Sequence, residues 1–246
     1  MRSYCFSIFL SVGLLLSQAT PFKAQAKPAT AASQTLPVTS MGGGEVALMQ
    51  GDPAAWKNVP AKRVALNRTP PLFDTDEPAA DEIASVDIRC ARDHEKLIVQ
   101  LNWHDATHDA DTLEKIPGSR PETRFHKVPS EESDRFFDAA AIMFPSKPAE
   151  GDQTPSLQMG DAGHPVQIYY WNGARGAMKM EAQGRETTRR TGESFPATGS
   201  YQSGNWTVVF ELPDLHVGTP LAFAVWNGSQ KDRDGRKYFS VWQILQ

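Results

Sequence analysis

The chain has 246 residues, of which 40% are hydrophobic and 22% are charged, and its formal net charge is −4. This mildly acidic balance argues against a nucleic-acid partner, because binding to phosphates requires a basic face. The sequence contains two cysteines, too few for a cysteine-ligated zinc or iron–sulfur site.

Residues 1–26 have the layout of a secretory signal peptide. Arg2 gives a positive start, Cys5 to Leu16 is a largely apolar run, and Ala24-Gln25-Ala26 is a small-x-small cleavage site. The run is too short to cross a bilayer, which needs about 20 apolar residues. We therefore expect cleavage, a periplasmic location and no membrane anchor in the mature protein; an uncleaved anchor is the alternative.

Cleavage leaves Cys90 as the single cysteine. No internal disulfide can then form, so the core must stabilise the fold, and the lack of a C-x-x-C-H motif argues against covalent c-type haem. Loss of Arg2 and Lys23 lowers the sum of Lys and Arg from 25 to 23 against 29 acidic residues, a net charge of −6. This balance suits a protein that docks with other proteins.

Residues 27–44 are rich in Ala, Thr, Pro, Ser and Gly, a composition typical of a disordered linker. From Glu45 onward, apolar runs with a period of two alternate with turns, which favours strands. The expected strands span 62–66, 85–91, 97–103, 139–144, 166–171, 206–212, 221–226 and 238–245. The predicted fold is all-β: an antiparallel β-sandwich over residues 45–246, with long irregular loops and at most short helices.

Two long charged segments, residues 104–135 and 179–200, are expected to be irregular. Loops of this length form docking surfaces, cover ligands or are solvated insertions. A short helix over 107–114 is the one helical expectation. The segment 104–135 also contains a group of residues of the types that bind metals: His104 and His108, four residues apart, with Asp105, Asp109 and Asp111 nearby. A loop that faces the solvent is the alternative interpretation of these residues.

A thioether and an amine each lie at the edge of an aromatic strand. Met159 precedes a Gly-Asp turn and the run 165–171, and Lys237 precedes the run 238–242. Taken singly, Met159 fills a gap in the core and Lys237 is a solvated charge. Together, beside apolar walls, they form a pair able to hold a haem iron from both sides.

These segments resemble the haem-b-binding gamma subunits of the type II dimethyl sulfoxide reductase family of molybdenum enzymes. That family includes ethylbenzene dehydrogenase, dimethyl sulfide dehydrogenase, selenate reductase and chlorate reductase. The matching stretches are 159–160, 165–168 with Trp171, 223–229, and 235–237 with Ser240 and Trp242. The resemblance covers roughly Trp56 to the C-terminus.

The resemblance implies that Met159 and Lys237 are the axial ligands of one non-covalent haem b. Lys231 is a rival to Lys237 within the same turn, and His164 is a rival to Met159. A lysine amine binds iron only when neutral, whereas its usual pKa is about 10.4, so burial must favour the neutral form.

Aromatic side chains near the two ligands are expected to line the cofactor. They are Trp171, Trp226 and Trp242. With both axial positions filled, the chain is expected to transfer electrons and not to be an enzyme by itself.

The implied partners are a molybdopterin-containing catalytic alpha subunit, an iron–sulfur beta subunit and a soluble c-type cytochrome. The alternative function is a haem-free carbohydrate- or ligand-binding β-sandwich, because fold alone does not separate the two. Its stacking platform would be Trp103, Tyr169, Trp171 and Trp226. A third hypothesis is a hydrolytic metal enzyme that uses His104 and His108.

Overall fold

The computed structural model describes residues 34–70, 82–110, 136–148 and 154–246. These residues belong to one compact unit that spans residues 33–246. The signal peptide predicted for residues 1–26 lies outside the described residues.

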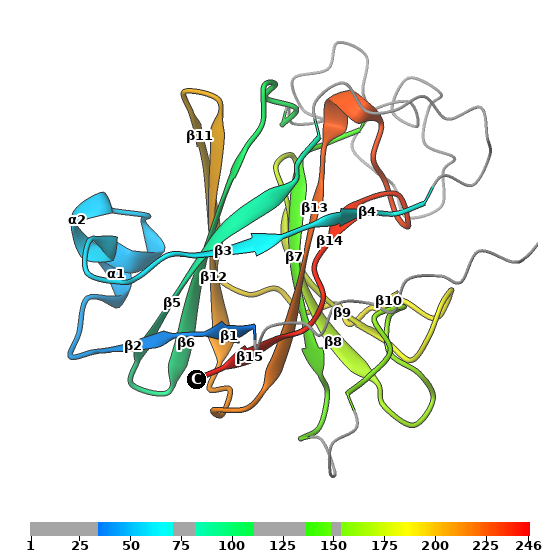
Figure 1. Cartoon of the computed structure of the whole chain (residues 1–246), viewed down its shortest axis with the longest axis horizontal. Coiled ribbons are helices and arrows are strands. Elements are labelled where there is room, and N and C mark those ends of the chain that lie inside the picture. The colour runs from blue at the N-terminus through cyan, green and yellow to red at the C-terminus, as the bar shows by residue number, and fades with distance from the viewer. Residues whose placement is uncertain (1–33, 71–81, 111–135, 149–153) are drawn as a thin grey trace, which may run out of the picture. The chain divides into compact units, whose positions relative to one another are not determined.

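Two β-sheets dominate the described part of the chain (Figure 1). The first sheet contains β1 (Thr35–Leu36), β4 (Asn67–Arg68), β7 (Ala139–Pro145), β8 (Val166–Asn172), β9 (Gly176–Ala182), β10 (Arg189–Arg190), β13 (Pro220–Trp226), β14 (Tyr238–Phe239) and β15 (Gln243–Leu245). Its order is β1-β15-β13-β7-β8-β9-β10, and β14 pairs with both β13 and β4.

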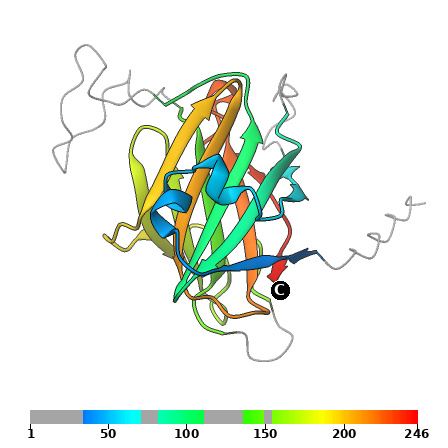
Figure 2. The same cartoon turned by 90° about the vertical axis from the view of Figure 1, so that its left-hand side faces the viewer.

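The second sheet contains β2 (Val38–Met41), β3 (Lys62–Ala65), β5 (Ser85–Asp93), β6 (Lys96–His104), β11 (Ala197–Gln202) and β12 (Asn205–Pro213). Its order is β11-β12-β6-β5-β2, with β3 paired to β5. Two short helices, α1 (Glu45–Met49) and α2 (Pro53–Trp56), lie over the outer face of this sheet (Figure 2). Among the described helices, none has the length and apolar character needed to cross a membrane.

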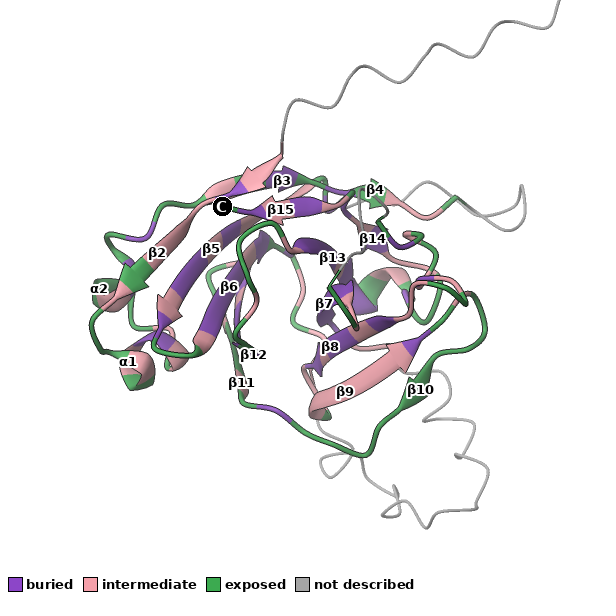
Figure 3. Cartoon of the chain, turned by 90° about the horizontal axis from the view of Figure 1, so that it is seen from below, coloured by how far each residue is buried: buried purple, intermediate pink, exposed green. Residues whose placement is uncertain are grey.

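The main core lies between the two sheets, and strand alternation decides which residues enter it. On β7, Ala140, Ile142 and Phe144 join this core, together with Leu101 and Val99 of β6. Because successive side chains of a strand point to opposite faces, the intervening residues of β7 lie on the outer face of the first sheet. Figure 3 shows that β7 is buried along most of its length, so both of its faces are covered.

The outer face of the first sheet carries a second apolar cluster. Ala139, Ala141 and Met143 of β7 belong to it, with Val166 and Ile168 of β8. No described helix covers this face, unlike the outer face of the second sheet. The first sheet therefore has one face in the sandwich core and one apolar face that the described helices leave uncovered.

The all-β sandwich predicted from the sequence is confirmed, and each expected strand has a counterpart. The run expected at 238–245 is divided into β14 and β15. Between them Ser240 still pairs with Phe223, since its N–H donates to the Phe223 carbonyl and its Oγ accepts from the Phe223 N–H, both at 2.9 Å.

The prediction of a disordered linker over residues 27–44 is wrong from residue 35 onward. β1 pairs in parallel with β15, and β2 pairs in parallel with β5, so the sandwich is not purely antiparallel. Leu36, only 1% exposed, anchors this segment in the core. The composition of the segment, rich in Thr, Ser and Pro, indicates disorder and gives no sign that one leucine is buried.

The two segments expected to be irregular differ in their secondary structure. Residues 179–200 contain the end of β9, all of β10 and the start of β11, so the expectation of an irregular loop is wrong there. Residues 105–110 are irregular, and residues 107–110 form no part of a helix. The remainder of the segment 104–135, residues 111–135, lies outside the described residues.

Asp138, fully buried just before β7, connects three parts of the fold. Its carboxylate accepts hydrogen bonds from the N–H of Gly228 at 2.9 Å, the N–H of Asp109 at 2.8 Å and Trp206 Nε1 at 2.9 Å. The short 3-10 helix η2 (Gly228–Gln230) follows β13, and Trp206 lies on β12 of the other sheet. One carboxylate therefore ties both sheets to the loop that precedes Lys237.

Burial raises the pKa of Asp138 to about 7, and hydrogen bonds from Gly228, Asp109 and Trp206 oppose the rise. The folded protein then binds more protons than the unfolded chain between about pH 4 and 7, since an unperturbed Asp has a pKa of about 3.9. The contribution of Asp138 to stability is therefore complete below about pH 4 and is lost as the pH rises through about 7.

We predict that Asp138→Asn lowers the free energy of unfolding by about 1–3 kcal/mol, because an amide cannot accept from all three donors. The loss should be larger at pH 5 than at pH 8 when urea unfolding is followed at both. The control is Asp87→Asn, because Arg63 beside Asp87 lowers the pKa of that carboxyl, so it titrates below this range. A pH-independent loss in the Asp138 variant would contradict the prediction.

Candidate functional site

The structure brings Met159 and Lys237 together, although 78 residues separate them in the sequence. Lys237 Nζ lies 3.7 Å from Met159 Sδ. Both residues lie on the outer face of the first sheet, where Met159 packs against the second apolar cluster. The two side chains proposed from the sequence as iron ligands thus share one face and one contact.

The amine of Lys237 has an apolar environment. Its Nζ lies 5.3 Å from the centre of the Trp226 ring, and it forms no ion pair with any described carboxylate. Burial lowers the pKa of Lys237, and the charge of Asp234 opposes that effect only in part. A half-buried amine without a counter-ion is costly as a cation, so this position favours the neutral form that binds a metal.

Local hydrogen bonds hold the backbone of Lys237. Its carbonyl accepts from both the N–H and the Oγ1 of Thr69, each at 2.9 Å. The next residue, Tyr238, begins β14 and pairs with Val225 of β13. The Trp226 ring is fixed as well, because its Nε1 donates to the Asp234 carbonyl at 3.1 Å. The loop therefore presents Lys237 from a defined backbone position.

Met159 lies in a tight turn with unusual backbone geometry. Its φ is 72°, and that of Gly160 is 74°. A left-handed conformation costs roughly 1–2 kcal/mol for a residue with a Cβ, so the surrounding contacts must compensate. The Gly160 N–H donates to Ser156 and the Met159 carbonyl accepts from Gly184, both at 2.8 Å. Such strain at a proposed ligand is consistent with a functional constraint.

Apolar and aromatic side chains on the outer face of the first sheet form a surface, the apolar floor, beside Met159 and Lys237. In the registered strands, Ala224 of β13 lies opposite Ala141 of β7, which lies opposite Tyr170 of β8. The neighbouring row contains Ala222, Met143, Ile168 and Met180. All of these residues belong to the second apolar cluster or pack against it. An apolar lining of this kind suits a cofactor with an apolar ring system.

The donor pair also suits a metal ion. A methionine thioether is a known kind of axial ligand of haem iron, and a neutral amine has a free electron pair for a metal. Both side chains are long, unbranched and rotatable, so they can move apart from their 3.7 Å contact to admit an ion.

The aromatic residues expected to line the site divide between the two faces of the sheet. Trp226 and Trp242 belong to the outer apolar face or pack against it. Trp171 lies in the core between the sheets, where its ring contacts Trp206 edge-on with centroids 5.1 Å apart. Trp171 therefore lies on the opposite side of β8 from Met159, away from the contact between Met159 and Lys237.

Tyr170 lies on the outer face of the first sheet, where the sequence analysis expected Trp171. The sequence analysis did not identify Tyr170 as a site residue. The Tyr170 ring meets Trp226 edge-on at 5.3 Å. The signal was present in the period of two: Val166 and Ile168 share the outer face with Tyr170, whereas Tyr169 and Trp171 face the core. Applying this alternation to the run 166–171 would have identified Tyr170.

The two rival ligands have less suitable positions. Lys231 is exposed, with a positive φ of 56° at the end of η2. The ring of His164 contacts Asp161, with Nδ1 2.8 Å from Oδ1, and this contact lowers the pKa of Asp161. His164 is therefore oriented by a local turn, and neither rival shares the contact between Met159 and Lys237.

The other sites considered from the sequence have weaker support. His104 is exposed, and His108 stacks on Tyr201 with ring centroids 4.9 Å apart. Within the described ranges, no group of three or more His, Cys, Asp or Glu side chains is arranged to hold a metal ion. Asp111, the last member of the predicted cluster, lies outside the described residues.

The predicted sugar-stacking platform is not a surface. Its four aromatic residues are only 2–7% exposed, and the first three belong to the core between the sheets: Trp103, Tyr169, Trp171 and Trp226. A buried ring cannot stack on a polysaccharide, so this part of the alternative function is wrong.

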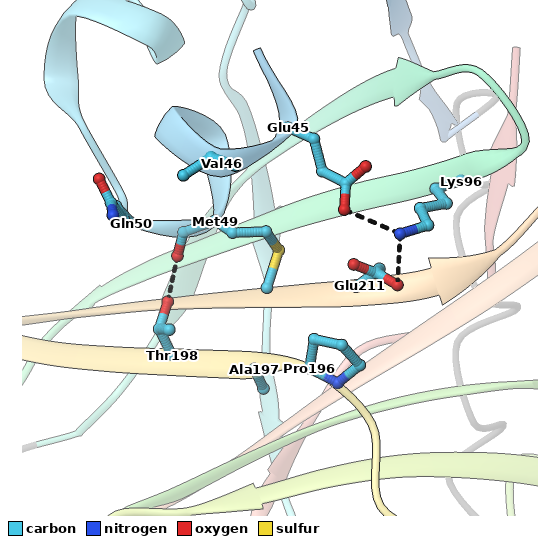
Figure 4. Close-up of a pocket in the computed structure, with 9 residues that line it drawn as sticks. All are labelled: Glu45, Val46, Met49, Gln50, Lys96, Pro196, Ala197, Thr198 and Glu211. Carbon is cyan, nitrogen blue, oxygen red and sulfur yellow. Dashed lines mark hydrogen bonds and ion pairs between the residues drawn. The ribbon is translucent and has the colours of Figure 1, made fainter. Parts of the chain in front are cut away.

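A separate hollow of about 460 Å³ lies between α1 and the strands β11 and β12. Figure 4 shows Lys96 between two carboxylates there, 2.8 Å from Glu45 and 3.1 Å from Glu211. The residues that line it include no aromatic side chain. With its cation already paired and no stacking ring, this hollow offers neither a sugar site nor an anion site.

The comparisons with known proteins identify the family of this chain. A family model described as ethylbenzene dehydrogenase matches residues 53–195, and the chain belongs to this family. The matched region contains Met159, whereas Lys237 lies beyond it.

Three relatives extend the similarity over most of the chain. A Haloferax mediterranei protein that bears the provisional name respiratory nitrate reductase heme subunit ORF7 is 30% identical, over 96% of this chain and 80% of its own length. The dimethylsulfide dehydrogenase subunit gamma of Rhodovulum sulfidophilum is 29% identical, over 85% and 79% respectively. The chlorate reductase subunit gamma of Ideonella dechloratans is 26% identical, over 87% and 85%.

We predict that Gly160→Ala disrupts the Met159 turn. An added Cβ would lie 2.6 Å from the His164 carbonyl oxygen, at a φ of +74° that disfavours side chains. The free energy of unfolding should fall by about 1–3 kcal/mol. Gly163→Ala is the control in urea unfolding, because its nearest new contact is 3.4 Å. Equal stability of the two variants would contradict the proposed strain.

Proposed function

We propose that this chain is the electron-transfer subunit of a periplasmic molybdenum oxidoreductase complex. It binds one haem b non-covalently, with Met159 and Lys237 as the axial ligands of the iron. The observation that carries the proposal is the 3.7 Å contact between Lys237 Nζ and Met159 Sδ on an apolar sheet face. The relatives' names, a heme subunit and two gamma subunits, support it.

The chain's own residues tune the site. When bound, the haem supplies a one-electron redox couple. Lys237 contributes a neutral amine, because burial lowers its pKa and its proton is released to solvent on ligation. Met159 contributes a soft thioether, which favours ferrous iron and raises the reduction potential.

Two protein ligands leave no position at the iron for a substrate. The chain therefore transfers electrons without catalysing a reaction itself. We assign catalysis to a molybdopterin-containing alpha subunit. In this proposal an iron–sulfur beta subunit carries electrons between the alpha subunit and this chain. A soluble c-type cytochrome is the external carrier in this proposal.

The ligands are tested by absorption spectra of protein expressed with a supply of haem. The wild type should contain haem b with the narrow bands of a six-coordinate low-spin iron when reduced. Lys237→Ala and Met159→Ala should each lose that spectrum, because an axial ligand is removed. Lys231→Ala and His164→Ala serve as matched controls and should retain it.

Two outcomes would overturn parts of this proposal. Protein that takes up no haem b under these conditions would refute the function. A normal spectrum in Lys237→Ala together with a changed spectrum in Lys231→Ala or His164→Ala would move the ligand to that rival.

The periplasmic location is tested by processing of the N-terminus. Expressed in a bacterium with a periplasm, the chain should be recovered there with Lys27 as its first residue, as measured by intact mass. Ala26→Phe should block cleavage, because the residue before the cut must be small, whereas Gln25→Ser should not. Recovery of the unprocessed wild type in the cytoplasm would contradict the proposal.

A further inference from the structure

The apolar floor of the first sheet ends at a cation. β10 pairs with β9 so that Arg190 lies opposite Met180. Directly opposed residues of an antiparallel pair project from the same face, and Met180 packs on the outer apolar cluster. Arg190 therefore lies at the end of the row of apolar side chains that includes Met180. Figure 3 shows that β10 is exposed, whereas β9 beside it is partly buried.

Arg190 and its neighbour Arg189 differ in their partners. Arg189 lies opposite Glu181, on the other face of β9, and its Nη2 is 2.5 Å from Glu181 Oε1. Arg190 instead lies opposite Met180, which carries no charge. The guanidinium on the apolar face is thus left to bind an anion, whereas the one on the opposite face is neutralised.

A hydroxyl group lies on the same face. The Tyr170 oxygen accepts a hydrogen bond from Asn172 Nδ2 at 3.2 Å, and its own proton has no acceptor within the described ranges. Burial raises the pKa of this hydroxyl, and the positive charges of Arg175 and Arg190 oppose the rise. Tyr170 is therefore within electrostatic reach of Arg190 and retains a proton to donate.

Haem is an apolar disc with two propionate carboxylates at one edge, so its site needs an apolar floor with cationic and hydrogen-bonding groups at its rim. We propose that Arg190 and Tyr170 bind the haem propionates. This inference rests on the proposed function. Arginine suits the task because its planar fork donates two parallel hydrogen bonds to a carboxylate.

The test compares two ligands whose macrocycles are the same. Haem and haem dimethyl ester, in which both propionates are esterified, are titrated into haem-free full-length protein and followed by the Soret band. Arg190→Gln should weaken haem binding roughly 10- to 100-fold, the range of a lost charge-assisted hydrogen bond. The same change should leave binding of the ester unaltered.

Two further variants define the site. Tyr170→Phe keeps the ring that contacts Trp226 and should weaken haem binding by a smaller factor, again without effect on the ester. Arg189→Gln, on the opposite face, should bind both ligands as the wild type does. Reduced spectra of all three should keep six-coordinate iron, since no axial ligand is changed.

Equal binding of haem to Arg190→Gln and to the wild type would overturn the inference, and so would equal losses for haem and its ester. Either result leaves the Met159 and Lys237 ligation intact if the low-spin spectrum persists. Failure of the wild type to bind either ligand would instead refute the proposed function.

Discussion

The structure depends most on the buried carboxylate of Asp138. Its three hydrogen bonds join Gly228 after β13, Asp109 after β6 and Trp206 on β12. The loop that leads to Lys237 therefore begins at a fixed point in the core, and the two hydrogen bonds from Thr69 to the Lys237 carbonyl fix its other end. A loop held at both ends can present a half-buried amine that forms no ion pair with a described carboxylate.

The two faces of the first sheet have separate roles. Alternate residues of β7, β8 and β13 either fill the core between the sheets or form the outer apolar floor. This explains why β7 has apolar residues on both faces, although only one face enters the sandwich. The inner face forms the larger core, and the residues of the outer face form a second buried cluster against which Met159 and Trp242 pack.

Much of the fold was predictable because the alternation of apolar and polar residues along a strand is visible within a few neighbouring residues of the sequence. The eight expected strands all exist, whereas β1, β2, β4, β9, β10 and β11 were missed. Four of these have only two to four residues, too few to show a period, and β9 and β11 lack a regular alternation of buried and exposed residues. The pair of Met159 and Lys237 was named from sequence, but their contact depends on long-range register. Trp171 was grouped with the residues around Met159 because the aromatic run was treated as one surface, whereas Tyr170 and Trp171 face opposite sides of the sheet.

The central claim is that one sulfur and one amine nitrogen complete the coordination of haem iron. Iron K-edge X-ray absorption of haem-loaded wild-type protein tests it most directly. The account predicts five nitrogen neighbours and one sulfur neighbour, with the sulfur signal absent from Met159→Leu and retained in His164→Ala. A wild-type spectrum with six nitrogen or oxygen neighbours and no sulfur would contradict it.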